Sequence, residues 1–233
     1  MRFQIAPDIA RDVPRIFIGI VVAEGVDNGQ SRPALAAALA EAVAAVLPGL
    51  GDRPKEDPRV LPYREAFAAL GINPNKYMCS IEALLTRIKK TGALPSINPA
   101  VDAGNAVSVR RLLPIGAHDL GRDGETTIEL RRARAGDAFV PFGSAQAEAV
   151  DPGEVVYASG GAVRTRRWMW RQSEIGKIGP ETTRIFYPID GFAGTNERAV
   201  LEARDELAEL LSRELGARVA KGFVSAESPV FMG

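Results

Sequence analysis

The sequence predicts an α+β fold, in which helices and strands occupy separate stretches of the chain instead of alternating strictly. Three observations support this class. Apolar residues at helical spacing dominate residues 31–106, and short β-branched stretches separated by Gly, Pro and Asp turns follow up to residue 189. A long amphipathic segment, residues 196–215, then predicts a final helix.

Composition fits one large globular domain or two small ones. The chain has 233 residues, of which 46% are apolar and 25% charged, so a mainly disordered protein is excluded. Lys and Arg together number 29, as do Asp and Glu, so the net charge is zero. A protein that coats DNA through overall positive charge is therefore not expected, although a local basic patch stays open.

The rarest residues limit the possible chemistry. Cys79 is the only cysteine and His118 the only histidine, which excludes an internal disulfide and the usual structural zinc sites. Nucleotide-binding glycine motifs, GxSxG and HExxH are absent as well, so we expect no cofactor and no metal. Cys79 is expected to be a buried, inert thiol.

The sequence carries no signal for a membrane. The longest strongly apolar run, residues 16–23, is far shorter than the roughly 20 residues of a spanning helix. Charged residues near the start, Asp8, Arg11 and Asp12, do not fit a secretory signal peptide. We therefore expect a soluble cytoplasmic protein with no membrane partner.

The first part of the chain predicts a strand followed by a helix. Residues 15–22 are apolar on both faces, as in a buried strand. Ser31 is a suitable N-cap with Pro33 in the first turn, and Pro48-Gly49 ends that helix. Residues 51–58 resemble a linker, which divides the chain into a strand–helix subdomain, residues 1–55, packed on a larger domain, residues 56–233.

Helices are expected next at residues 63–70, from Ser80 to about residue 91, and from Asn98-Pro99 onward. In the third of these, Asn98, Asp102 and Asn105 share one face, and we expect their polar groups to be hydrogen-bonded. Such a face can also line a pocket. The strands expected thereafter are residues 107–113, 126–131, 138–142, 154–157, 162–169, 184–189 and 218–224.

Residues 164–177 form the most distinctive segment. Five cations stand there against Glu174 alone, and both tryptophans of the chain, Trp168 and Trp170, lie among them. Arginines bind phosphates and aromatic rings stack on unpaired bases, which favours an RNA-binding surface. The alternative is a strand whose tryptophans share one buried face while its cations face solvent. In either case we expect at least one tryptophan to be buried.

Three ordered segments resemble one known family. Residues 95–109 (PSINPAVDAGNAVSV), 113–121 (LPIGAHDLG) and 171–191 (RQSEIGKIGPETTRIFYPIDG) are similar to the B3/B4 domain, the tRNA-editing module in the β chain of bacterial phenylalanyl-tRNA synthetase. The similarity covers roughly residues 60–191, and the chain resembles standalone proteins of this type. It implies a B3/B4-like mixed or antiparallel sheet flanked by helices.

The resemblance also implies a function. The synthetase domain hydrolyses tyrosine wrongly attached to phenylalanine tRNA, and the glutamate that reads the tyrosine hydroxyl falls on Glu174. Gln172-Ser173 stand where the synthetase has two glycines, and the family's pocket histidine falls on Gly116, two positions before His118. The aminoacylation core is absent, so this chain is not expected to be a complete ligase.

The first hypothesis is therefore a freestanding hydrolase that cleaves mischarged aminoacyl-tRNA in trans, with tRNA and its amino-acid moiety as partners. Its site residues would be Glu174, His118 and Asn105 for the aminoacyl group, and Arg166, Arg167, Arg171 and Lys177 for the RNA. The alternatives are a non-catalytic module that binds RNA or an amino-acid-like small molecule, and a structural domain with a closed pocket. Whether the chain is an enzyme is left open by the sequence.

Overall fold

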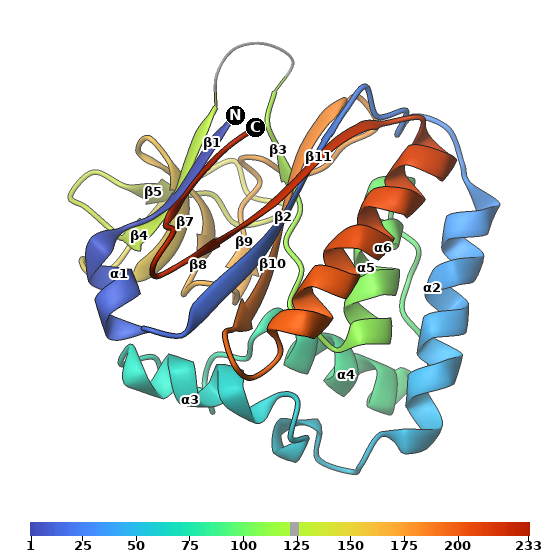
Figure 1. Ribbon diagram of the computed structural model, residues 1–233, viewed down its shortest axis with the longest axis horizontal. Helices are drawn as coiled ribbons and strands as arrows, with labels where there is room; N and C mark the ends of the chain where they lie inside the picture. The colour runs from blue at the N-terminus through green and yellow to red at the C-terminus, as the bar shows by residue number, and fades with distance from the viewer. Residues whose placement is uncertain (122–125) are drawn as a thin grey trace.

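The computed structural model describes residues 1–121 and 126–233, in which two β-sheets pack together and helices cover the second sheet (Figure 1). Sheet B is antiparallel, in the order β11 (Arg218–Ser225), β2 (Ile16–Glu24), β10 (Arg184–Phe192), β3 (His118–Asp119). Sheet A runs β12 (Val230–Met232), β1 (Arg2–Ile5), β4 (Thr127–Arg132), β7 (Val155–Ser159), β8 (Ala162–Arg166), β5 (Ala138–Phe139), β6 (Glu148–Ala149), with β9 (Arg171–Gln172) paired to β8.

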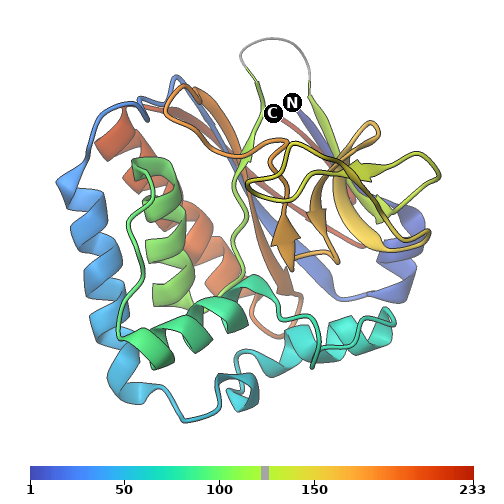
Figure 2. The ribbon, with the colours of Figure 1, turned by 180° about the vertical axis from the view of Figure 1, so that it is seen from behind.

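Sheet A is mixed, because β1 runs parallel to β4 and β5 runs parallel to β8. Helices α2 (Pro33–Val46), α5 (Pro99–Arg111) and α6 (Glu197–Leu215) lie on the face of sheet B that points away from sheet A (Figures 1 and 2). The predicted α+β fold, with a mixed or antiparallel sheet flanked by helices, is confirmed, and the structure contains one sheet of each kind.

Strand β2 forms the centre of the molecule, as its apolar sequence predicts. Its even-numbered side chains, from Ile16 to Val22, share a hydrophobic cluster with Phe3 of sheet A. Its odd-numbered side chains, such as Val21, belong to the cluster that contains Val200 of α6. Both faces of the strand are thus buried, which explains a run without polar alternation.

The remaining helices border the two sheets. A short helix, α1 (Pro7–Asp12), links β1 to β2, and two 3-10 turns (Leu47–Gly49 and Pro54–Glu56) lead from α2 to α3. Helices α3 (Leu61–Ala69) and α4 (Ser80–Thr91) cross below the sheets in the view of Figure 1. The expected cap of α5 is present, since the Asn98 Oδ1 atom accepts a hydrogen bond from the Val101 amide at 3.0 Å.

The first 55 residues are part of both sheets. They contribute β1, which pairs with β4 and β12, and β2, which pairs with β10 and β11. Backbone pairing therefore crosses the division that the sequence places near residue 55. The division into a subdomain of residues 1–55 packed on residues 56–233 stays a prediction.

The strand predicted at residues 107–113 is wrong, because α5 continues through this stretch to Arg111. Ala100, Ala103 and Val107 form a helical stripe that is buried in the cluster between α5, α6 and sheet B. Burial of that stripe outweighs the weak preference of β-branched residues for strands. Leu112, with a φ of 57°, then ends the helix in the left-handed conformation.

The strand predicted at residues 162–169 is too long. Strand β8 ends at Arg166, and the next residues form a turn in which Arg167 and Trp168 have φ values of 46° and 61°. Trp168 and Trp170 therefore do not share one strand face, as the strand prediction requires. The expectation that at least one tryptophan is buried is confirmed, because Trp168 has no exposed surface.

Candidate functional site

A partly open cavity of about 90 Å³ lies where β7, β8 and β9 of sheet A approach β10 of sheet B. In Figure 1 these strands lie near the middle of the molecule. The cavity wall comes from the loop before β3, the strands, the turn after β8 and the first residue of α4. Its residues are Ser80, Ile115, Gly116, His118, Tyr157, Thr165, Trp168, Met169, Trp170, Gln172, Pro188 and Asp190.

Asp190 supplies a buried carboxylate to this cavity. Its Oδ1 atom accepts hydrogen bonds from the Tyr157 hydroxyl at 2.7 Å and from the Trp168 indole N–H at 2.8 Å. Burial raises the pKa of the Asp190 carboxyl to about 6, and the two donated hydrogen bonds oppose that rise. At neutral pH the carboxyl group is therefore mainly ionised, although burial makes the ionised form less favourable than it is in water.

The turn after β8 brings Trp168 to this carboxylate. Non-glycine residues with positive φ cost on the order of 1–3 kcal/mol each, so two in succession need compensation. The Trp168 amide donates to the Val155 carbonyl at 2.7 Å, and its ring packs edge-on against Phe192. The Arg167 guanidinium lies 4.0 Å from the centroid of the Tyr77 ring. These contacts hold the strained turn and fix the indole N–H toward Asp190.

His118 is the second ionisable group in the cavity wall. Burial and, to a smaller extent, the nearby Arg164 charge together lower the pKa of its imidazole to about 3. The ring is therefore neutral at physiological pH. Its Nδ1 atom is buried without a hydrogen-bond partner among the residues that the structure describes. His118 can thus accept a hydrogen bond but is too weakly basic to carry a proton at pH 7.

Glycine at position 116 keeps space open beside this imidazole. A Cβ atom there would lie 3.2 Å from the His118 Nε2 atom and 3.1 Å from the Pro188 Cγ atom. The resemblance places the family's pocket histidine at this position, and the His118 ring lies next to the space that a side chain at 116 would enter. The shift by two residues therefore does not remove an imidazole from the cavity.

The two residues that replace the family's glycines have different roles. Gln172 is in the cavity wall, and its side-chain amide donates a hydrogen bond to the Ala117 carbonyl. It thereby links β9 to the loop that leads into β3, where His118 lies. Ser173 turns away toward β5, where its hydroxyl accepts from the Val140 amide and donates to the Val140 carbonyl. Only Gln172 narrows the cavity.

Glu174 and Asn105 lie outside this wall, as judged over the described residues. The Glu174 carboxylate accepts a hydrogen bond from the Gly143 amide at 2.7 Å and pairs with Lys177 at 3.1 Å, and both contacts lower its pKa. Asn105 is half-buried on α5. Of the residues expected to hold the aminoacyl group, the structure therefore brings only His118 to the cavity. Asp190, Tyr157 and Gln172 were not predicted as site residues.

The predicted polar face of α5 is hydrogen-bonded at two of its three positions. Asp102 is buried and accepts from the Ile97 amide at 2.9 Å and from the Ser96 hydroxyl. Asn98 caps the helix, and its side-chain amide also donates to the Ile178 carbonyl at 3.3 Å. Asn105 has no side-chain hydrogen bond within the described part of the chain. This face fixes the loop before α5, away from the cavity at Asp190.

We expect Asp102→Ala to destabilise the protein by about 1–3 kcal/mol, because the Ile97 N–H and the Ser96 hydroxyl lose a buried acceptor. Urea unfolding followed by far-UV circular dichroism measures the change. Asn105→Ala is the matched control on the same face, with an expected change within about 0.5 kcal/mol. Equal effects of the two substitutions would contradict this role of Asp102.

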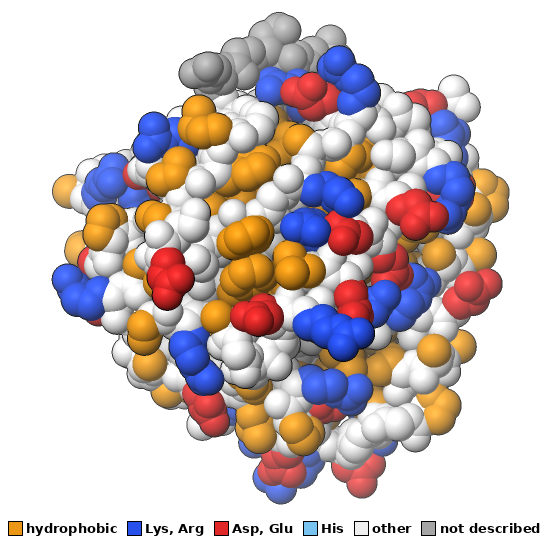
Figure 3. All heavy atoms as spheres, viewed as in Figure 1, with side chains coloured by type: hydrophobic (Ala, Val, Ile, Leu, Met, Phe, Trp, Pro, Cys, Tyr) orange, Lys and Arg blue, Asp and Glu red, His pale blue; other side chains and the backbone are white. Residues whose placement is uncertain are grey.

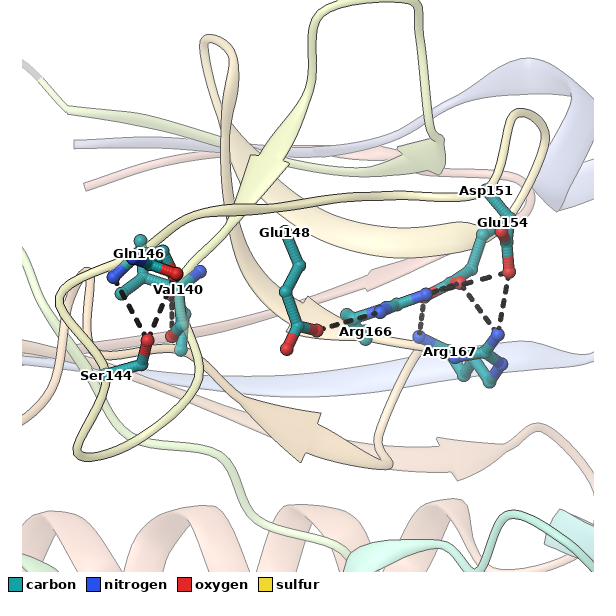
Figure 4. A network of polar contacts seen from close by, with 9 residues as sticks. Val140, Ser144, Gln146, Glu148, Asp151, Glu154, Arg166 and Arg167 are labelled. Atoms are coloured by element: carbon teal, nitrogen blue, oxygen red, sulfur yellow. Dashed lines mark hydrogen bonds and ion pairs between the residues drawn. The ribbon is translucent and has the colours of Figure 1, made fainter.

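Acidic residues neutralise much of the basic segment. The Arg166 guanidinium contacts both Glu154 carboxylate oxygens, at 2.9 and 2.8 Å, and Arg167 lies 3.0 Å from Asp151 (Figure 4). Arg171 is exposed and has no ion pair within residues 1–121 and 126–233, where its described contacts are with aromatic rings. Of the predicted RNA contacts, Arg171 is therefore the one whose charge is not already paired.

The face of the molecule shown in Figure 3 has no large basic area, because Lys and Arg side chains lie among Asp and Glu side chains there. Within the described residues, no cluster of three or more His, Cys, Asp or Glu side chains is arranged to hold a metal ion. Cys79 is buried and burial raises the pKa of its thiol to about 12, which fits the inert thiol that was expected. No described helix is both long enough and apolar enough to cross a bilayer.

Comparison with known proteins gives a family. Among curated proteins there is no match. The solved structures include a similar chain, the crystal structure of an N-terminal fragment of the phenylalanyl-tRNA synthetase β-subunit from Pyrococcus horikoshii, with 10% sequence identity and a TM-score of 0.45. The alignment covers 93% of this chain and 49% of that one, so the chain spans about half the length of that fragment.

The family comparison agrees with the sequence motifs. The model of the B3/4 domain matches residues 62–220, which is more than half of the chain and includes every residue named above in the cavity wall. The resemblance drawn from residues 60–191 is thereby confirmed. The chain belongs to the B3/4 domain family.

Proposed function

We propose that this protein is a freestanding hydrolase that cleaves the ester bond of mischarged aminoacyl-tRNA. The observation that carries the proposal is the cavity at Asp190, which combines a buried carboxylate, a neutral imidazole and aromatic walls in a member of the B3/4 family. A concave, largely apolar site with a few convergent polar groups is the usual form of a small-ligand site.

Ester hydrolysis requires a positioned water molecule and stabilisation of the oxyanion, and it does not require a protein nucleophile. The neutral His118 ring is suited to accept a hydrogen bond from that water. Ser80, in the cavity wall, is the first residue of α4, so the positive end of this helix dipole would favour a developing negative charge. A ribose hydroxyl of the tRNA can assist the proton transfer, which is consistent with the weak basicity of His118.

Recognition of the RNA would rest mainly on Arg171. It follows the turn that carries Trp170 and is adjacent in sequence to Gln172 of the cavity wall. Arg166 and Arg167 already have carboxylate partners and would have to exchange them for phosphates. Lys177 would likewise have to leave Glu174. We therefore expect these three to contribute less to tRNA binding than Arg171.

Deacylation of a panel of aminoacyl-tRNAs tests the proposal directly. We expect the wild-type protein to accelerate release of at least one amino acid, and His118→Ala to slow that release by up to about tenfold, since one hydrogen bond of a neutral group contributes about 0.5–1.5 kcal/mol. Acid-quenched time courses with labelled amino acids provide the rates. A His118→Ala protein with wild-type rates on every substrate would contradict the role of His118.

The same panel decides the role of Glu174. Because the Glu174–Lys177 pair lies at the surface, where solvent screens ion pairs, we expect Glu174→Ala to fold normally and to give a clean comparison. Since Glu174 lies outside the cavity wall, we expect the preference among amino acids to be unchanged in this variant. A changed preference with unaltered tRNA affinity would instead assign recognition to Glu174.

One observation favours a second candidate function, a non-catalytic module that binds an amino-acid-like small molecule. The carboxylates of Asp151 and Glu154 offset Arg166 and Arg167, which leaves little free positive charge beside the cavity. Binding of small ligands without deacylation of any aminoacyl-tRNA would select this alternative.

A further inference from the structure

Asp190 has one carboxylate oxygen that is bound and one that is not. Oδ1 accepts the hydrogen bonds of Tyr157 and Trp168. Oδ2 has neither a hydrogen bond nor an ion pair within the residues that the structure describes. Because Asp190 is almost fully buried and forms part of the cavity wall, a partner for Oδ2 has to come from inside the cavity.

The main chain holds this carboxylate in place. The Asp190 amide donates to the Pro114 carbonyl at 3.0 Å, and the Asp190 carbonyl accepts from the Tyr63 hydroxyl at 3.0 Å. Tyr63 is itself fixed, because its hydroxyl accepts from the Asn196 side-chain amide at 2.8 Å. A ligand would therefore meet Oδ2 already in position, which lowers the entropic cost of binding.

The charge of Asp190 is not balanced by the protein. Within the described chain, no Lys, Arg or His nitrogen lies within ion-pair distance of its carboxylate. A buried carboxylate without a counter-charge is costly, and a cationic ligand would remove that cost. The rings of Tyr157, Trp168 and Trp170 in the same wall also favour a cation.

We propose that Asp190 is the binding residue for a primary ammonium group, and that the cavity takes a compact aminoacyl group whose α-amino group pairs with Oδ2. Naming the ligand as an aminoacyl group rests on the proposed function, whereas ammonium binding does not. The volume of about 90 Å³ favours a compact side chain, since an apolar cavity of roughly 150 Å³ is the size that holds benzene. A divalent metal ion fits less well, because Asp190 is the only acidic side chain among the described residues of the cavity wall.

Amino-acid amides are suitable probes, because they carry the ammonium group but lack the labile ester. Glycinamide, L-alaninamide, L-serinamide and L-tyrosinamide are titrated into the full chain by calorimetry at about pH 7.5, each beside its N-acetylated form. We expect at least one compact amide to bind, and acetylation to weaken its binding by about tenfold or more, because a charge-assisted hydrogen bond is lost. Asp190→Asn should produce the same loss for the free amide and little change for the acetylated one.

Two further variants distinguish loss of the ammonium-binding carboxylate from a general loss of folding. Tyr157→Phe removes one donor to Oδ1 but leaves Oδ2 free, so the preference for the free amine should persist. Asp205→Asn removes a surface carboxylate that pairs with Lys221, and it should bind like the wild type. Thermal unfolding of each variant shows that it is folded.

Three results would overturn the inference: equal binding of free and acetylated amides, an Asp190→Asn protein that binds like the wild type, and absence of binding by any amide at millimolar concentration. Failure of the proposed function gives a different result. In that case amides bind through Asp190 although no aminoacyl-tRNA is deacylated. Deacylation that is unaffected by Asp190→Asn and by N-acetylation of the substrate would retain the proposed function and remove Asp190 as the anchor.

Discussion

Asp190→Asn is expected to stabilise the protein at pH 8 by up to about 3 kcal/mol while it weakens ammonium binding by about tenfold or more. The pKa of the carboxyl rises from 3.8 to about 6 on burial, a shift of roughly two units at 1.36 kcal/mol each. Asparagine retains an oxygen for the Tyr157 and Trp168 donors and carries no charge. A side chain that lowers the stability of the folded protein and lies in a cavity wall fits a binding role, because stability is often lost at functional sites.

The pH dependence has a definite sign. Because the folded-state pKa of Asp190 is raised, its favourable contribution is fully present below about pH 4 and is lost as pH rises through about 6. The difference in unfolding free energy between variant and wild type should therefore be near zero at pH 4 and largest above pH 7. His118, whose pKa is lowered to about 3, has the opposite dependence, but it is common to both proteins and cancels in the difference.

Urea unfolding of both proteins between pH 4 and pH 8 measures this difference. The ionisable groups that face the Asp190 region, Tyr63, Tyr157 and His118, stay neutral over that range, because burial raises the pKa of both tyrosines and lowers that of the histidine. An Asp190→Asn protein that is less stable than the wild type at pH 8 would show that the carboxylate is already compensated within the protein.

Sequence patterns sufficed for the elements whose burial is simple. Strand β2 is apolar along its whole length because both of its faces are buried, and α6 has an apolar stripe because one of its faces is buried. Both patterns are therefore visible in the sequence. Residues 107–113 were assigned to a strand, because Val107 and Val109 favour strands locally, whereas packing of α5 between α2 and α6 decides the outcome. Strands as short as β3 and β9 have too few residues for any periodicity.

The cavity was less predictable than the fold. His118 could be named as a candidate because the resemblance implies a pocket histidine near this position, whereas Gln172 was noted only as a departure from the family pattern. Asp190 lies within an apolar strand, and only the pairing of β10 with β2 and the turn at Trp168 show that it meets Tyr157. An isolated carboxylate in an otherwise apolar strand is the signal that could have identified it, since burial of such a group has to be compensated.

The free positive charge of residues 164–177 could not be predicted from that segment alone, because Asp151 and Glu154, which pair with Arg167 and Arg166, lie outside it.

Trp168→Ala should have the largest effect on stability, with a loss of about 3–5 kcal/mol, because a fully buried large aromatic side chain is removed and a void remains. Trp170 provides the matched control two residues away. It is half-buried, and its ring contacts Tyr77 edge-on and the Arg167 guanidinium, so Trp170→Ala should cost distinctly less. Denaturant unfolding of both variants, followed by circular dichroism, gives the two values.

Trp168→Phe separates packing from hydrogen bonding at this position. Phenylalanine fills much of the space but has no N–H for the Asp190 Oδ1 atom, so the carboxylate keeps only the Tyr157 donor. The loss of this donor disfavours the ionised form, and the pKa of Asp190 should rise further above 6. The stability difference between Trp168→Phe and wild type should consequently grow as pH increases from 5 to 8, because only the wild type stabilises the ionised carboxylate with two donors. A difference that does not vary with pH would mean that the indole contributes packing alone and does not hold Asp190 for a cationic ligand.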